Sequence, residues 1–195
     1  MTRRWSSRDL ALVATFAGVV AALGLVPAVL PPGIPVPITA QTLGVMLAGS
    51  VLGARRGAGA LLLFLVLVAV GLPLLAGGRG GLGVFAGPSI GYLVGFPLCA
   101  GVVGWLVERG GTTYRLAWGV VANVVGGIVV IYALGIAGTV LVTHLGVWPV
   151  VAGTGWFVLG DAVKAVAAAF VARGVHAAYP GLLGVARPAR ERTPV

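Results

Sequence analysis

The sequence predicts an all-α membrane protein, a compact bundle of six transmembrane helices with both termini in the cytoplasm. Composition, chain length and the distribution of basic residues predict this fold class. Apolar residues make up 59% and charged residues 9% of the chain, whereas soluble domains contain about 45–50% and about 25%. The mean hydropathy is +1.09. Such a small number of charged residues cannot cover a water-facing surface. The composition therefore excludes a soluble enzyme and a disordered chain, and it excludes a nucleic-acid binder despite the net charge of +9.

The length of the chain sets the number of spans. A membrane helix needs roughly 20 mostly apolar residues, so six helices use about 120 residues. Six spans leave short loops within 195 residues, whereas eight leave almost nothing to connect them. The 33 glycines and 12 prolines fit a membrane bundle, because small residues let helices approach closely and neighbouring helices satisfy broken backbone hydrogen bonds.

Six apolar runs, separated by short breaks, predict the six helices in chain order. The runs cover residues 10–29, 38–52, 58–75, 89–107, 116–142 and 150–172. The first run stops at Pro31-Pro32-Gly33. The second run is short and ends before Arg55 and Arg56.

The later runs end at glycine-rich or charged breaks. The third ends in the glycine-rich segment 77–81, and the fourth ends at the charged residues 108–109. The fifth run is long enough to tilt or to be broken near residues 126–127, which are both glycine. The sixth is followed by Arg173 and a basic tail that contains proline.

The six runs form a single unit. We expect one six-helix membrane domain over residues 1–178 and a basic cytoplasmic tail over residues 179–195. No internal repeat supports a transporter built from two inverted halves. The first run is also not a good secretory signal, because its apolar stretch exceeds the usual length of about 7–15 residues.

The basic residues predict the orientation of the bundle. Eleven of them fall on the side of the two termini: Arg3, Arg4, Arg8, Arg55, Arg56, Arg109, Arg115, Arg173, Arg187, Arg190 and Arg192. The loops of the other side contain only Arg79, and Lys164 lies within a span. Because cytoplasmic loops carry an excess of Lys and Arg, this asymmetry favours an even number of spans with both ends inside.

Two charged residues within the sixth run are the first candidates for a functional site. A charge at the centre of a membrane helix costs about 2.5–3.5 kcal/mol on insertion scales. Asp161 and Lys164 are three residues apart, so both project from one face of the helix, and that face cannot point toward lipid. One interpretation is a self-neutralised pair that holds helices together. The interpretation we favour is a polar ligand pocket, or an ion or proton path, inside the bundle.

The segment 77–83, Gly-Gly-Arg-Gly-Gly-Leu-Gly, is the second candidate. Glycine lets the backbone approach a ligand and exposes amides that bind an anionic or carbonyl group, which makes Gly78 and Gly80 candidate contacts. Arg79, alone in the outer loops, offers a bidentate partner for a carboxylate. The alternative is a flexible turn with one arginine that reaches the membrane surface.

Four more polar side chains lie within or beside the spans, namely Gln41, Tyr92, Asn123 and Tyr132. Each can contact a ligand, although a lone polar residue of this kind more often forms a hydrogen bond between helices. The chain offers little for catalysis: it has no P-loop before its only lysine, and no metal-binding motif around its two histidines. We therefore expect no enzyme, no cofactor and no metal site.

The first run carries two stripes of small residues. Ala14, Gly18 and Ala22 recur at every fourth position, as do Ala17 and Ala21. Stripes of this kind let another helix pack closely. They predict either packing within the bundle or a docking surface for a partner protein.

Several motifs in register resemble the biotin transporter BioY family. They cover residues 35–49 (PVPITAQTLGVMLAG), 71–73 (GLP), the glycine-rich segment, 87–96 (GPSIGYLVGF) and 160–165 (GDAVKA). The resemblance implies a six-helix S component of an energy-coupling-factor transporter in the cell membrane. Such a protein captures a vitamin from outside and docks, through the small residues of its first helix, onto a transmembrane coupling subunit driven by two ATPase subunits.

The resemblance also implies site residues. In the family, the aspartate and lysine of the G-D-x-x-K-A motif contact biotin, which corresponds to Asp161 and Lys164 here, and the residue between the glycine pairs lines the pocket, which corresponds to Arg79. Relatives carry Asn or Ser there, and some carry an arginine where this chain has Leu93, so Arg79 is expected to bind the carboxylate. The remaining expected contacts are Gly78, Gly80, Phe85, Tyr92, Gln41 and Asn123.

Two other functions stay open on the sequence alone. The first is an S component for a different vitamin, because composition cannot separate the substrates. The second is a small membrane enzyme or a purely structural subunit, which would show no saturable binding of a small molecule.

Overall fold

The computed structural model describes residues 5–111 and 113–183, which form helices joined by loops. The helices are α1 (Ser7–Leu23), α2 (Gln41–Leu52), α3 (Ala54–Ala69), α4 (Ile90–Arg109), α5 (Leu116–Val124), α6 (Ile131–Thr143) and α7 (Val147–Ala178). A short 3₁₀ helix covers Leu82–Ala86, and a π-helical segment, Val125–Val130, joins α5 to α6. The described residues contain no strand, only two isolated β-bridges.

Within the described residues, the predicted count of six helices is confirmed once α5 and α6 are taken together. They form one continuous helix, Leu116–Thr143, of 28 residues. The predicted break near Gly126 and Gly127 is a π-helical segment rather than a loop. A Cβ atom at Gly126 would collide with Val103, and one at Gly127 with Met46, so the two glycines let the helix lie close to α4 and α2.

The first predicted span was too long. Helix α1 ends at Leu23 rather than at residue 29, because Pro27 lies inside the predicted span and has no backbone N–H to continue the helix. Gly24, which follows α1, lies against the carbonyl oxygen of Leu74, where a side chain would not fit. The following segment forms a loop, in which Val29 and Ile38 pair as an antiparallel bridge. The second span therefore begins at Gln41 rather than at residue 38.

Three helices of the described chain are long and apolar enough to cross a membrane: α4, the joined α5–α6 helix and α7. Helix α2 is a shorter apolar helix of 12 residues, and α1 and α3 have 17 and 16 residues. The bundle therefore has the character of a multi-pass membrane protein, with three clear spans among six helices.

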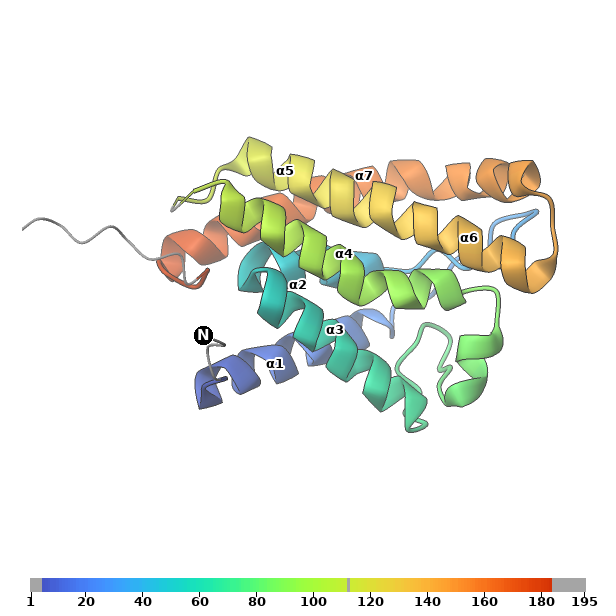
Figure 1. The fold of residues 1–195 in the computed structure, drawn as a ribbon, viewed down its shortest axis with the longest axis horizontal. Helices are drawn as coiled ribbons and strands as arrows, with labels where there is room; N and C mark the ends of the chain where they lie inside the picture. The colour runs from blue at the N-terminus through green and yellow to red at the C-terminus, as the bar shows by residue number, and fades with distance from the viewer. Residues whose placement is uncertain (1–4, 112, 184–195) are drawn as a thin grey trace, which may run out of the picture.

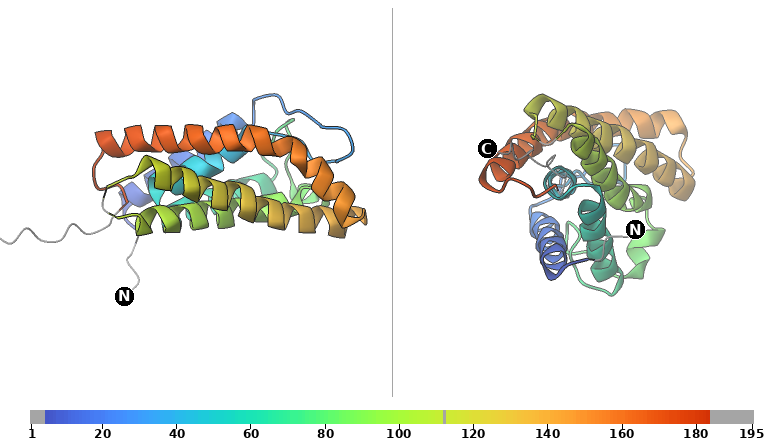
Figure 2. Two further views of the ribbon diagram at one scale, coloured as in Figure 1. Left: turned by 90° about the horizontal axis from the view of Figure 1, so that it is seen from above. Right: turned by 60° about the vertical axis from the view of Figure 1, so that its left-hand side comes forward.

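The helices pack as a bundle whose long axis follows the spans (Figures 1 and 2). Helices α1 and α3 lie together on one side and the α5–α6 helix lies beside α7 on the other, with α2 and α4 between them. Gly91 permits the close crossing of α4 over α6, since its ideal Cβ position lies against the backbone of Leu134 and Gly135. Small residues at such crossings are typical of membrane helices.

The two ends of the bundle differ in charge. The start of α1, the α2–α3 junction, the α4–α5 loop and the end of α7 lie at the left end in Figure 1. The described basic residues of that end are Arg8, Arg55, Arg56, Arg109, Arg115 and Arg173. Arg79 belongs to the loop that follows α3, at the opposite end. The other five predicted members of the basic group, in 1–4 and 184–195, lie outside the described residues.

Candidate functional site

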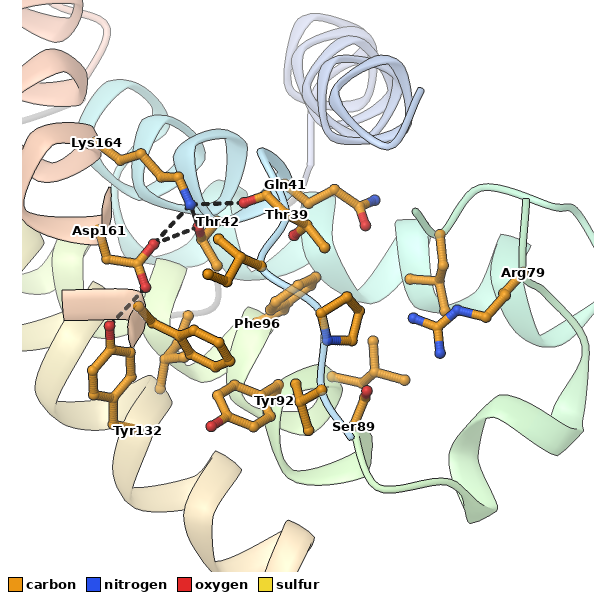
Figure 3. Close-up of a pocket in the computed structure, with 17 residues that line it drawn as sticks. Thr39, Gln41, Thr42, Arg79, Ser89, Tyr92, Phe96, Tyr132, Asp161 and Lys164 are labelled. Atoms are coloured by element: carbon orange, nitrogen blue, oxygen red, sulfur yellow. Dashed lines mark hydrogen bonds and ion pairs between the residues drawn. The ribbon is translucent and has the colours of Figure 1, made fainter. Parts of the chain in front are cut away.

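A pocket opens near the end of the bundle that holds the α3–α4 loop (Figure 3). Its empty space, including the open mouth, is about 540 Å³. The walls come from the α1–α2 loop, the start of α2, the glycine-rich loop, the start of α4, α6 and the middle of α7. The lining residues are Val36, Pro37, Ile38, Thr39, Gln41, Thr42, Leu75, Arg79, Ser89, Tyr92, Leu93, Phe96, Ile131, Tyr132, Phe157, Asp161 and Lys164.

Asp161 and Lys164 form an ion pair at one end of this pocket. Lys164 Nζ lies 2.9 Å from Asp161 Oδ1, one helical turn apart on α7. The Asp161 residue is 4% exposed, and both residues line the cavity. The sequence placed both on one helix face that turns away from lipid, and the structure shows that face directed into the bundle.

Three neighbouring residues complete this polar group, which we call the Asp161 cluster (Thr39, Thr42, Tyr132, Asp161 and Lys164). Thr42 Oγ1 donates to Asp161 Oδ1 at 3.0 Å, and Tyr132 Oη donates to Asp161 Oδ2 at 2.8 Å. Lys164 Nζ donates to the Thr39 carbonyl oxygen at 2.7 Å and to Thr42 Oγ1 at 3.0 Å. The cluster thus joins α2, α6 and α7 and at the same time forms one wall of the pocket.

The hydrogen-bonding capacity of the ion pair is only partly used. A carboxylate has about four lone-pair sites, and Asp161 accepts from Thr42, Tyr132 and Lys164. One site is left for a donor in the cavity. The ammonium group of Lys164 has all its hydrogens engaged, so a ligand acceptor must replace one of its present partners.

Gln41 lines the pocket, but its amide is bound to backbone groups. Its Nε2 donates to the carbonyl oxygens of Val20 and Leu74, at 3.2 and 3.1 Å, and its Oε1 accepts from Ala76 N at 3.2 Å. Gln41 is 2% exposed. It therefore ties the end of α1 to the glycine-rich loop and fixes that loop against the pocket.

The glycine-rich loop is a tight turn with Arg79 at its end. Leu75 and Arg79 pair through their backbones, at 3.0 and 3.3 Å. Gly77 and Gly78 have φ of 78° and 69°, a left-handed conformation that favours glycine. Arg79 Nε donates to Ala76 O at 3.2 Å, and the exposed side chain reaches the pocket, as Figure 3 shows.

The structure does not bring every predicted residue into the pocket. Gly78 and Gly80 line a separate outer hollow with Gly83, Val84, Gly87 and Pro88, and Arg79 and Ser89 line both spaces. Phe85, half-buried in the 3₁₀ helix, packs on the apolar core and is not among the lining residues. Tyr92 does line the pocket, with its ring edge-on to Phe157 at 6.1 Å and its hydroxyl 3.4 Å from Thr154 Oγ1.

The prediction that Asn123 contacts a ligand is not supported by its position. Asn123 is fully buried, accepts from Ser50 Oγ at 2.8 Å and donates to the Ala165 carbonyl oxygen at 3.1 Å. Both ends of its amide are thus occupied by α2 and α7, away from the cavity. This is the interhelical hydrogen bond that the sequence left as the alternative.

Sequence reasoning missed several lining residues. Thr42 and Phe96 lie inside the motifs that carry the family resemblance, but nothing in their spacing marked them. Tyr132 was recognised as a polar residue in an apolar run and was not assigned to the site. Ser89 also escaped notice, since a serine before an apolar run is the usual start of a helix.

The two stripes of small residues on α1 have different environments in the structure. Ala14, Gly18 and Ala22 are exposed, and a Cβ atom at Gly18 would meet open space. Ala17 is buried and Ala21 packs against the core. The first stripe is exposed on the described chain, whereas Ala17 and Ala21 belong to the internal packing that was the alternative for them.

A comparison with models of protein families identifies the family of the chain. The family model described as the BioY family matches residues 1–181. The chain belongs to the BioY family. The resemblance carried by the sequence motifs is therefore confirmed.

Curated members of the BioY family are similar over nearly the whole chain. The biotin transporter BioY of Rhizobium etli is 50% identical over 181 residues, which cover 90% of this chain and 96% of that protein. The biotin transporter BioY of Rhodobacter capsulatus is 48% identical over 186 residues, which cover 90% and 97%.

A solved structure has the same fold. The crystal structure of the S-component for biotin from an ECF-type ABC transporter superposes with a TM-score of 0.85 at 25% sequence identity. The match covers 89% of this chain and 95% of that one. The two chains therefore share one overall fold.

Proposed function

We propose that this BioY-family protein is the biotin-binding S component of an energy-coupling-factor transporter, a membrane protein that captures biotin and catalyses no reaction. The observation that carries the proposal is the pocket, which has an ion pair at one end, an arginine at the other and apolar walls between them. The similarity to proteins named biotin transporters supports the choice of ligand.

The Asp161 cluster suits the ureido ring of biotin. That ring has two N–H donors and one carbonyl acceptor. The free lone pair of Asp161 accepts from one N–H, and Tyr132 and Thr42 hold the carboxylate in place for it. Lys164 donates to the ureido carbonyl, exchanging one of its bonds to Thr39 or Thr42.

The rest of the cavity suits the rest of the molecule. The rings of Tyr92, Phe96 and Phe157 line the space next to the cluster and match the apolar sulfur ring. Arg79 lies toward the other side of the pocket in Figure 3. A guanidinium group there matches the valerate carboxylate.

The orientation follows from the charges of the two ends. The end with most of the basic residues faces the cytoplasm, because Lys and Arg are retained on that side. Both termini then lie inside, and the pocket opens toward the outer leaflet. The membrane domain is residues 1–178 and the basic tail is residues 179–195.

The exposed small residues of α1 serve the coupling step. We assign Ala14, Gly18 and Ala22 as the contact for a transmembrane coupling subunit, which two ATPase subunits drive. Gly18→Leu adds bulk where a side chain has open space, so biotin binding stays normal while biotin uptake by the assembled transporter falls. Gly155→Leu is the matched control, because Gly155 is also exposed in open space.

Direct binding of biotin tests the pocket. The purified chain should bind biotin, and Asp161→Asn and Lys164→Ala should each weaken binding roughly 10- to 100-fold, since hydrogen bonds to charged groups contribute about 1.5–3 kcal/mol. Arg173→Ala removes a basic residue of the same helix far from the pocket and should leave affinity unchanged. Undiminished affinity in both pocket variants would refute the assignment.

Two further measurements separate the alternatives. A competition panel of labelled vitamins distinguishes biotin from another vitamin. Saturable binding also raises thermal stability, by about 2.7 kcal/mol at a ligand concentration 100 times the dissociation constant. A structural subunit would show no such increase.

A further inference from the structure

Ser89 is the N-cap residue of α4, yet its side chain does not cap the helix. Serine is favoured at this position because its hydroxyl accepts from an amide of the first turn, and Ser89 makes no such bond. The residue is 9% exposed, and its Oγ is buried with no hydrogen-bond partner among residues 5–111 and 113–183. A buried hydroxyl without a partner is costly, so this one indicates a ligand group that completes it.

The location of Ser89 indicates where that ligand group lies. Ser89 and Arg79 are the two residues that line both the pocket and the outer hollow. In Figure 3 they lie on the side of the pocket away from Asp161 and Lys164. A ligand held by its ring at the Asp161 cluster therefore extends its other end toward Ser89.

The electrostatics of this place favour an anion. The N-terminus of a helix carries roughly half a positive charge, and α4 is a helix of 20 residues with no acidic residue in its first turn. Arg79 adds a full positive charge, and its guanidinium is bound through Nε to Ala76 O, which leaves the terminal nitrogens for another acceptor. A donor hydroxyl, a guanidinium and a helix N-terminus together match a carboxylate.

We propose that Ser89 Oγ, the Arg79 guanidinium and the N-terminus of α4 form a carboxylate subsite, in which Ser89 donates a hydrogen bond to the acid group of the ligand. This inference rests on the proposed function, since biotin supplies the carboxylate. Ser89 is then a specificity residue: it favours the free acid over derivatives in which the acid is masked.

The test uses the full chain in detergent. Titration calorimetry compares its affinity for biotin with its affinity for biotin methyl ester. Ser89→Ala should weaken biotin binding about tenfold and methyl ester binding less than about twofold, because only the charge-assisted bond is lost. Ser89→Thr keeps the hydroxyl and should retain the preference for biotin. Arg79→Gln should reduce the same preference.

The outcomes separate the two proposals. Unsubstituted protein that binds neither ligand overturns the proposed function and this inference with it. Normal binding of biotin by the unsubstituted protein, with the same ratio of the two affinities in Ser89→Ala, overturns the subsite alone. An equal loss of both ligands in Ser89→Ala also overturns it, because that result assigns Ser89 to packing.

Discussion

Two polar groups join the same three parts of the bundle, but only one of them faces a cavity. The Asn123 cluster, which consists of Ser50, Asn123 and the Ala165 carbonyl, links α2, the α5–α6 helix and α7. The Asp161 cluster links the same helices nearer the pocket. Met46 is fully buried between them and packs with Ala165 and Ala168 of α7.

The difference lies in the charge of each group and in whether it borders the cavity. The neutral amide of Asn123 needs no solvent and has a partner at both ends, so helices can close around it. Asp161 and Lys164 carry full charges, whose burial is expensive without several partners. Both charged residues line the pocket, and one lone pair of the Asp161 carboxylate remains for a ligand. Similar helix contacts thus produce a packing bond in one place and a candidate binding site in the other.

The largest expected effect concerns the coupling of the two charges. Asp161→Asn and Lys164→Gln should each weaken biotin binding roughly 10- to 100-fold. The double variant should lose less than the product of the two single losses, because the charges interact directly and each single change leaves the other unpaired. Titration calorimetry on the four proteins measures this. Losses that multiply would contradict action of the pair as a unit.

The second prediction tests whether Tyr132 holds the Asp161 carboxylate in place for the ligand. Tyr132→Phe removes the 2.8 Å hydrogen bond to Asp161 Oδ2 and keeps the ring against Phe157. Because this bond is present without ligand, its loss should lower the free energy of unfolding of the unliganded protein by about 1.5 kcal/mol. Biotin affinity should also fall, by about tenfold, because the carboxylate is no longer held in place for the ureido N–H. Unchanged affinity would show that Tyr132 only packs.

A substitution in the Asn123 cluster should lower the stability of the protein and leave its affinity for biotin nearly unchanged. Asn123→Ala removes two interhelical hydrogen bonds and should lower the free energy of unfolding by about 1–2 kcal/mol, since one such bond averages about 0.6 kcal/mol in a membrane protein. Biotin affinity of the folded protein should stay within about twofold. Val124→Ala, at an exposed neighbouring position, is the control. Weaker binding without loss of stability would place Asn123 in the site after all.

The smallest effect is expected for Ser50→Ala. It removes one donor to Asn123 and leaves the bond to Ala165 in place. The free energy of unfolding should fall by about 0.6 kcal/mol, and a thermal unfolding series with Asn123→Ala measures it. A loss as large as that of Asn123→Ala would mean that the two bonds act as one unit.

The sequence alone determined the class and much of the site. Few charges and long apolar runs without period-2 alternation predicted helices in a membrane, because only helices and closed barrels satisfy the backbone there and a barrel needs that alternation. The i, i+3 spacing of Asp161 and Lys164 placed both on one inward face, since helical geometry is local. The ends of the helices were predicted less well: the first predicted span ran through Pro27, which has no backbone N–H to continue a helix, whereas α1 ends at Leu23.

Only the tertiary structure decided which polar residues meet. Gln41, Asn123 and Tyr132 look alike in sequence, each a lone polar residue near an apolar run. In the bundle, Gln41 ties down the glycine-rich loop, Asn123 closes a helix contact and Tyr132 supports the carboxylate. Their roles depend on partners 21 to 73 positions away along the chain, and such pairings arise from packing, which no local pattern encodes.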